Sequence, residues 1–297
     1  MYYLLSLLSG VLIAIMLTVN GELAAQYDLH WATVFIHMAG LALSGLIVLA
    51  RRDKPFANRQ RWVWYMGGAV GVLNTIFANF AISQLSVSAL LAFILLGQST
   101  TGLLVDHFGL WGMPKRPFRR GNLIGLAIIL GGIASMLTNF APAAMLAAFG
   151  TGSGVVMTRT LNAQLTRLTN VPISTFATYV VGLLCSIPVF LLFGDRGMAL
   201  VGLQLSSIWF IYLGGLFGVG VVALNSIASV KIAAFYLTLF VFLGQVLTGS
   251  LLDTLIDGAF SIRIFLGGLT VAAGLCVNLL LDRRRRQREE AAITGQG

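Results

Sequence analysis

The chain has 297 residues, of which 58% are hydrophobic and only 10% are charged. Water could not cover that much apolar surface, whereas lipid can, so the composition excludes an ordinary soluble domain. A net charge of +9 would also suit a nucleic-acid-binding protein. The basic residues, however, lie mainly in the connections between apolar segments and in one run near the C-terminus, so we expect no nucleic-acid partner.

Ten apolar segments follow one another along the chain, each close to the ~20 residues that a helix needs to cross a bilayer. They predict an all-α integral membrane protein with ten transmembrane helices. The segments lie at roughly 3–23, 31–50, 62–82, 87–106, 121–140, 144–165, 172–193, 207–228, 233–253 and 262–281.

The second half of the chain repeats the first. The pattern Gly97-Gln98-x-x-Thr101-Gly102-x-Leu104-x-Asp106 recurs 147 residues later, as Gly244-Gln245-x-x-Thr248-Gly249-x-Leu251-x-Asp253. In the first two segments and the last segment of each half the offset is 142, and the change of offset falls in loops. Duplication predicts insertions confined to loops. We therefore expect two five-helix repeats, at 1–140 and 141–282, followed by a basic cytoplasmic tail at 283–297.

An odd number of spans in each repeat makes the two copies enter the bilayer in opposite orientations. In the first repeat all Lys and Arg residues lie in the connections 51–61 and 107–120, and the connections 24–30 and 83–86 have none. Because basic loops stay in the cytoplasm, this bias predicts a cytoplasmic N-terminus. The run Arg283–Arg286 predicts a cytoplasmic C-terminus, either as an anchor on anionic lipid or as a patch for a partner. We expect a multi-pass protein of the cell (inner) membrane.

Polar side chains within the apolar segments are the candidate substrate-binding residues, because each costs free energy in lipid. These candidates are Asn20, Glu22, His37, Gln98, Arg159, Asn162, Gln164 and Gln245. The repeat pairs Asn20 with Asn162 and Gln98 with Gln245. It pairs Glu22 with Gln164, and Arg159 with Leu17, so the halves differ in charge where a substrate would bind.

Each candidate also has a structural interpretation. Glu22 could be a solvated helix end, and Arg159 could extend to the cytoplasmic edge rather than bind an anion or Glu22. Gln98 and Gln245 could join helices at a crossing instead of donating to a substrate. His37 could titrate near neutral pH, but a single buried histidine is more often a packing residue.

Sequence motifs for energy-coupled or hydrolytic chemistry are absent. The chain has no G-x-x-x-x-G-K-[ST], H-E-x-x-H or G-x-S-x-G pattern. We therefore expect no ATP hydrolysis, no enzyme activity, no cofactor and no metal. The two cysteines, Cys185 and Cys276, fall inside apolar segments and are expected to be small buried hydrophobes.

Three local patterns stand out in the first half: Gly10-x(9)-Asn20-x-x-Leu23, the block from Gly97-Gln98 to Phe108-Gly109, and Pro114-x-Arg116-Pro117. Together they resemble the YdcZ-like family of the drug/metabolite transporter superfamily. The resemblance covers residues 1–282 and implies two fused five-helix units. The second half departs from the pattern after Asp253. Met16 and Thr158 stand where some members have a glutamine, so a substrate contact of that glutamine is not carried over.

The inverted repeat favours a secondary transporter with a site near the midplane between the two units. It would move a small organic ion, metabolite or drug by alternating access, and Glu22 and Arg159 together would leave the charge of the substrate open. The alternative is a non-transport membrane protein, such as a lipid-handling or sensory scaffold. As partners we expect a small-molecule substrate, membrane lipid, and coupling protons where Glu22 or His37 changes protonation. Because both repeats are fused in one chain, we expect a monomer.

Overall fold

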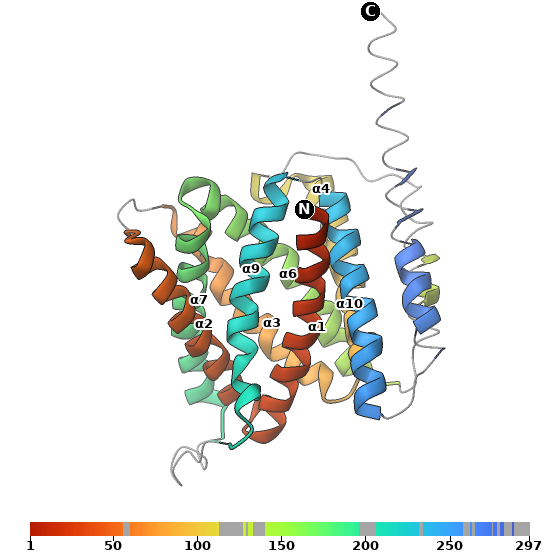
Figure 1. The fold of residues 1–297 in the computed structure, drawn as a ribbon, viewed down its shortest axis with the longest axis horizontal. Helices are drawn as coiled ribbons and strands as arrows, with labels where there is room; N and C mark the ends of the chain where they lie inside the picture. Colours follow the sequence, from red (N-terminus) through yellow and green to blue (C-terminus); the bar gives the residue numbers. More distant parts are fainter. Residues whose placement is uncertain are drawn as a thin grey trace, which may run out of the picture.

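The computed structural model describes most of the chain, and all regular elements within the described residues are helical (Figure 1). The described residues are 1–55, 60–112, 127, 128, 130–132, 140–195, 206–231, 234–257, 262, 265–274, 276, 277, 280, 281 and 287.

The described elements are α-helices and short 3₁₀ helices that pack side by side as a bundle (Figure 1). They are α1 (Tyr2–Gln26), α2 (Leu29–Arg51), η1 (Trp62–Met66), α3 (Gly67–Ile82), α4 (Val87–Phe108), η2 (Leu110–Gly112), α6 (Pro142–Leu168), α7 (Val171–Phe193), η3 (Trp209–Leu213), α9 (Gly214–Lys231) and α10 (Ala234–Asp257).

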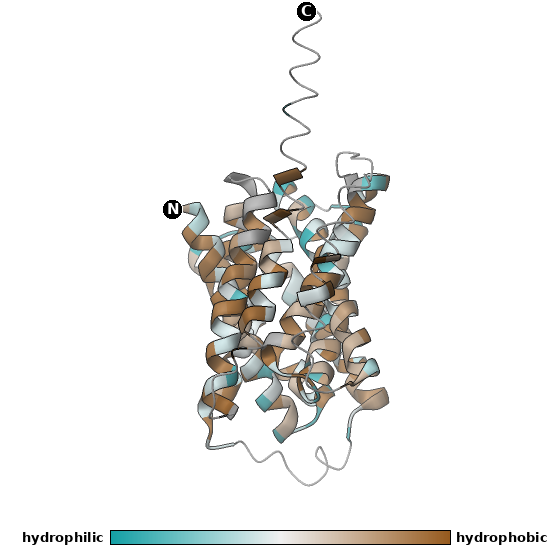
Figure 2. Cartoon of the chain, turned by 90° about the vertical axis from the view of Figure 1, so that its right-hand side faces the viewer, coloured by the Kyte–Doolittle hydropathy of each residue, from teal (hydrophilic) through white to brown (hydrophobic). Residues whose placement is uncertain are grey.

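Eight of the ten expected spans coincide with these helices to within a few residues. The expected spans 121–140 and 262–281 lie only partly within the described residues, and the basic run Arg283–Arg286 lies outside them. In the described part, four helices are long and apolar enough to cross a membrane: Tyr2–Gln26, Leu29–Arg51, Trp62–Ile82 and Val171–Phe193. Figure 2 shows hydrophobic residues along the lengths of the helices, with many hydrophilic residues near their ends.

Side-chain caps fix where several helices begin. Asp28 accepts from the backbone N–H of His30 at 3.0 Å at the start of α2, and Ser86 accepts from Ala89 at 3.3 Å at the start of α4. Asn170 accepts from Ile173 at 2.9 Å at the start of α7. Such caps satisfy backbone donors that a helix leaves free at its N-terminus.

The helix contacts occur in pairs that follow the sequence repeat. α1 packs on α10 and α9, and α6 packs in the same way on α4 and α3, while α2 packs on α7. A Cβ at Gly10 of α1 would overlap the carbonyl oxygen of Val241, and one at Gly152 of α6 would overlap that of Ile94. Gly10 is the repeat mate of Gly152, and Val241 is the mate of Ile94. Glycine therefore permits the same close backbone approach in both halves.

The equivalent helices of the two repeats, α1 and α6, run in opposite directions through the bundle, as three contacts indicate. α1 begins at the end of the bundle where α10 begins, and Tyr3 packs on Phe240 there with ring centroids 5.2 Å apart. α10 ends where α4 begins, because Asp253 Oδ1 accepts from the N–H of Val87 at 2.8 Å. α6 runs alongside α4, with Thr101 donating to Ser153 at 2.8 Å. α1 and α6 therefore run in opposite directions (Figure 1).

Candidate functional site

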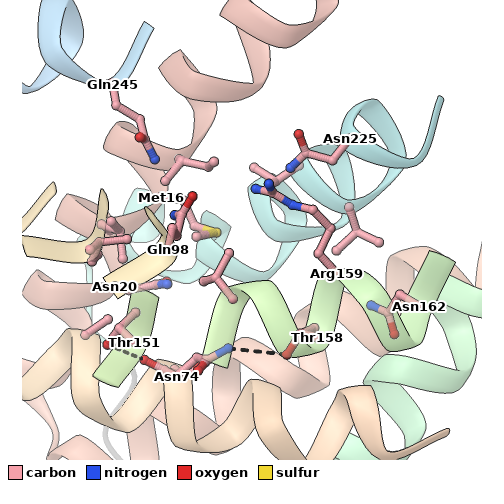
Figure 3. Close-up of a pocket in the computed structure, with 18 of the residues that line it drawn as sticks. Met16, Asn20, Asn74, Gln98, Thr151, Thr158, Arg159, Asn162, Asn225 and Gln245 are labelled. Atoms are coloured by element: carbon pink, nitrogen blue, oxygen red, sulfur yellow. Dashed lines mark hydrogen bonds between the residues drawn. The ribbon is translucent and has the colours of Figure 1, made fainter. Parts of the chain in front are cut away.

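A cavity of about 190 Å³ lies inside the bundle, between α1, α3, α4, α6, α9 and α10. It is lined by both repeats and contains five of the eight candidate residues. These five are Asn20, Gln98, Arg159, Asn162 and Gln245 (Figure 3).

Helical periodicity explains which side chains reach the cavity. On α1 the lining residues are Ile13, Met16, Leu17 and Asn20, which are three or four positions apart and share one face. On α6 the same spacing links Thr151, Val155, Thr158, Arg159, Asn162 and Ala163. The cavity is therefore bounded by one continuous stripe from each of these two helices.

Several residues line the cavity together with their own repeat mates. The lining includes the pairs Asn20 with Asn162, Gln98 with Gln245 and Ile13 with Val155. Both glutamines are nearly inaccessible, with exposed fractions of 8% and 2%. In the described part of the chain, the amide nitrogen of Gln245 has no hydrogen-bond partner. A buried amide without a partner has hydrogen-bonding capacity to offer a ligand.

The two asparagines sit against the starts of α9 and α3. A Cβ at Gly214 would overlap the side-chain oxygen of Asn20, and one at Gly67 would overlap that of Asn162. Asn162 Oδ1 also accepts from Thr178 Oγ1 at 3.0 Å, whereas Asn20 Oδ1 has no partner among the described residues. The pair is thus held by equivalent backbone contacts, but only its second member is fixed by a side-chain hydrogen bond.

The wall formed by α3 and α6 is polar. Asn74 Nδ2 donates to Thr158 Oγ1 at 3.3 Å, and Thr158 Oγ1 donates to the carbonyl oxygen of Gly67 at 3.4 Å. Thr151 Oγ1 lies 3.5 Å from the carbonyl oxygen of Asn74 (Figure 3). These hydrogen bonds join the two helices of the wall side by side.

The opposite wall, formed by α1 and α9, is mainly apolar. Its residues Met16, Leu17, Val221 and Val222 are the repeat mates of Thr158, Arg159, Asn74 and Thr75, respectively. These four residues of the α3–α6 wall therefore have apolar mates on the α1–α9 wall. Asn162 differs, because its mate Asn20 is also an asparagine, and α9 contributes the polar Asn225, whose mate is Ala78.

Arg159 supplies the charge of the cavity. Among the residues that line the cavity in the described part, it alone is formally charged. It forms no hydrogen bond or ion pair with another described residue. Figure 3 shows its guanidinium leaving α6 and reaching toward the side of α9 where Asn225 lies.

Glu22 does not share this cavity, so the expectation that it lies together with Arg159 is corrected. It is exposed and lines a second cavity of about 600 Å³, near the ends of α1, α3 and α10. Glu22 follows Asn20 by two residues, which is a rotation of about 200° around the helix axis. The two side chains therefore point to opposite faces. Asn79 lines both cavities.

Gln164 and His37 also lie outside the cavity lining. Gln164 is two residues beyond Asn162, and its Nε2 donates to the carbonyl oxygen of Trp111 at 3.3 Å. His37 is buried between α2 and α7, with Nδ1 2.8 Å from the carbonyl oxygen of Thr33. Its ring packs against Gly182, while the ring of its repeat mate Tyr179 packs against Gly40. His37 therefore packs at a helix crossing.

The comparisons with known proteins follow the two halves of the chain. A family model described as "Putative inner membrane exporter, YdcZ" matches residues 1–135 and again residues 143–280. The chain belongs to the YdcZ family. As a member it is a transmembrane protein of the drug/metabolite transporter class. The YdcZ resemblance inferred from local patterns is thereby confirmed.

A solved crystal structure is similar to this YdcZ-family chain over nearly its whole length. The TM-score is 0.64, with 19% identity over 95% of this chain and 96% of the other. At that identity the likeness concerns the fold alone. A search of curated proteins found no match.

Six polar residues that line the cavity are not among the sequence candidates: Asn74, Thr75, Asn79, Thr151, Thr158 and Asn225. Asn74 and Asn225 are mid-span amides whose repeat mates, Val221 and Ala78, are apolar. That contrast, together with helical spacing from Asn162 to Thr158, was the signal available in the sequence.

Proposed function

We propose that this YdcZ-family protein is a secondary transporter of the inner membrane that moves a small organic molecule by alternating access. The observation that carries the proposal is the central cavity lined by repeat-related residues of both halves. A transporter needs a site that either side can reach, and an interface between inverted units provides one near the midplane.

In this proposal ten transmembrane helices form two inverted five-helix units, at 1–140 and 141–282, with a basic tail at 283–297. The paired contacts of α1 with α10 and α6 with α4 support the duplication. The opposite directions of α1 and α6 support the inversion (Figure 1). Rocking of one unit against the other would close the cavity at one end and open it at the other.

Accessibility of one engineered cysteine tests alternating access without knowledge of the substrate. We replace Cys185 and Cys276 with alanine and introduce Val155→Cys, which lines the cavity. An impermeant thiol reagent should label it in both right-side-out and inside-out vesicles. A matched control, Leu184→Cys, replaces a side chain on α7 that is 64% exposed on the bundle surface, and it should react from neither side in lipid. Labelling of Val155→Cys from a single side would contradict alternating access.

The proposed orientation has both termini in the cytoplasm, following the loop charges. Arg52→Cys, after α2, should then be protected from the reagent in intact cells, while Ser207→Cys, before η3, should react. The end of α2 and the segment that leads into α9 lie at opposite ends of the bundle (Figure 1). The reverse pattern would overturn the orientation while leaving the cavity untouched.

A further inference from the structure

The cavity contains an unneutralised cation, and its surroundings indicate what would neutralise it. A charged side chain at membrane depth costs at least ~2.5–3.5 kcal/mol on insertion scales. Proteins usually offset this cost with a partner, yet Arg159 has none in the described part of the chain. No described carboxylate lines this cavity: Glu22 lines the second cavity, and Asp253 accepts from the N–H of Val87 at the start of α4. Since no described residue supplies the negative charge, a bound anion is the source that the cavity itself offers.

We infer that the cavity binds a small organic monocarboxylate, with its carboxylate on Arg159 and its apolar body against the α1–α9 wall. This inference rests on the proposed function and deepens it by naming the substrate class. Guanidinium groups bind carboxylates through two parallel hydrogen bonds, which fixes the orientation of the ligand as well as its charge.

The two unequal walls give the ligand a direction. Thr158 and Asn74 lie on the α3–α6 wall, and Arg159 extends from that wall toward Asn225 of α9 (Figure 3). The rest of the α1–α9 wall presents Met16, Leu17 and Val221. A strongly hydrated inorganic anion would have to lose its water against that apolar wall without compensation. A monocarboxylate with an apolar body places one charge on one cation and covers the remaining surface.

Hydrogen-bonding capacity in the cavity agrees with a polar ligand group. Gln245 Nε2 and both side-chain polar atoms of Asn79 are buried without partners in the described residues. Unpaired buried donors of this kind are costly unless a ligand or water meets them. A volume of about 190 Å³ corresponds to roughly six water molecules in the liquid, so the ligand is compact.

Benzoate is a suitable probe because it combines one carboxylate with a compact apolar body. Binding to the full-length protein in detergent is measured by calorimetry and thermal shift, with benzamide, benzylammonium and inorganic phosphate as comparison ligands. We expect benzoate to bind at least about tenfold more tightly than benzamide, and neither benzylammonium nor phosphate to bind. Equal binding of benzoate and benzamide, or binding of phosphate or benzylammonium alone, would overturn the inference.

Variants assign the effect to Arg159. Arg159→Gln should remove the preference for benzoate over benzamide, and Arg159→Lys should keep the preference while weakening benzoate. Arg167→Gln is the matched control, since Arg167 is an exposed arginine in the last turn of the same helix, outside the cavity lining. Unchanged benzoate affinity in Arg159→Gln would refute the assignment. Should Arg159→Gln not fold, the ligand series on the wild-type protein and Arg159→Lys still decides the question.

The two proposals fail in different ways. Labelling of Val155→Cys from both sides together with no benzoate binding would support the transporter proposal and refute the proposal of a carboxylate ligand. Benzoate binding together with labelling from one side would leave an anion site in a protein that does not alternate.

Discussion

The two walls of the cavity come from equivalent helices of the two repeats, yet they differ sharply in polarity. The α3–α6 wall joins Asn74 to Thr158 by a hydrogen bond and carries Arg159, whereas the α1–α9 wall presents Met16 and Val221 at the matching positions. Positions that hold helices together are the same in both halves, as Gly10 and Gly152 illustrate. These glycine packing positions have thus stayed equal, whereas the cavity positions of Asn74, Thr158 and Arg159 have diverged.

This contrast has a physical reason. A glycine under a backbone carbonyl has no replacement that fits, in either repeat, so both copies must keep it. A cavity residue contacts ligand or water instead of a neighbouring helix, so one copy can change without unfolding the protein. Divergence between repeat mates that line the cavity, such as Leu17 and Arg159, therefore points to a ligand contact that differs between the walls. Identity alone does not indicate packing, because Gln98 and Gln245 are identical and both line the cavity.

The largest effect on stability should come from a substitution at a packing glycine that both repeats share. In Gly152→Leu the new side chain would overlap the carbonyl of Ile94, and we expect a loss of about 3 kcal/mol or more, with little folded protein. Gly102→Leu is the control, because no atom lies within 4 Å of a Cβ there. Size-exclusion profiles and melting temperatures distinguish the two. Normal folding of Gly152→Leu would contradict the close approach of α6 and α4.

A smaller effect is expected from moving the positive charge of Arg159 from one wall of the cavity to the other. Arg159→Leu makes the mates equal and should weaken benzoate binding about a hundredfold without lowering the melting temperature, since an unpaired charge is removed. The double variant Leu17→Arg/Arg159→Leu moves the charge to the mate across the cavity. It should regain at least about tenfold of the lost affinity, measured by calorimetry. Failure to regain any affinity would show that the two walls are not interchangeable.

The smallest effects belong to the carboxylates outside the cavity. Asp253→Leu removes the acceptor for the N–H of Val87 at the start of α4, which should cost about 1 kcal/mol and lower the melting temperature. Glu22→Gln is its control and should change neither stability nor benzoate affinity, because Glu22 is exposed in the second cavity. A loss of benzoate binding in Glu22→Gln would show that Glu22, in the second cavity, contributes to binding in the first.

The sequence alone determined the parts of this protein that depend on length and on repetition. Bilayer thickness fixes the length of an apolar segment, so the expected span 31–50 agrees with α2 at Leu29–Arg51. The repeat offset identified Asn20 with Asn162 and Gln98 with Gln245, and each pair lines the cavity.

Only the tertiary structure decided which face of each helix meets the cavity. Glu22 and Gln164 are polar and lie two residues from cavity asparagines, but that spacing turns them to other faces. His37 is a candidate by chemistry, yet the crossing of α2 and α7 encloses it against Gly182. The rotation of a helix about its axis is set by packing against its neighbours, so polarity in a segment reveals a candidate and the packing decides its role.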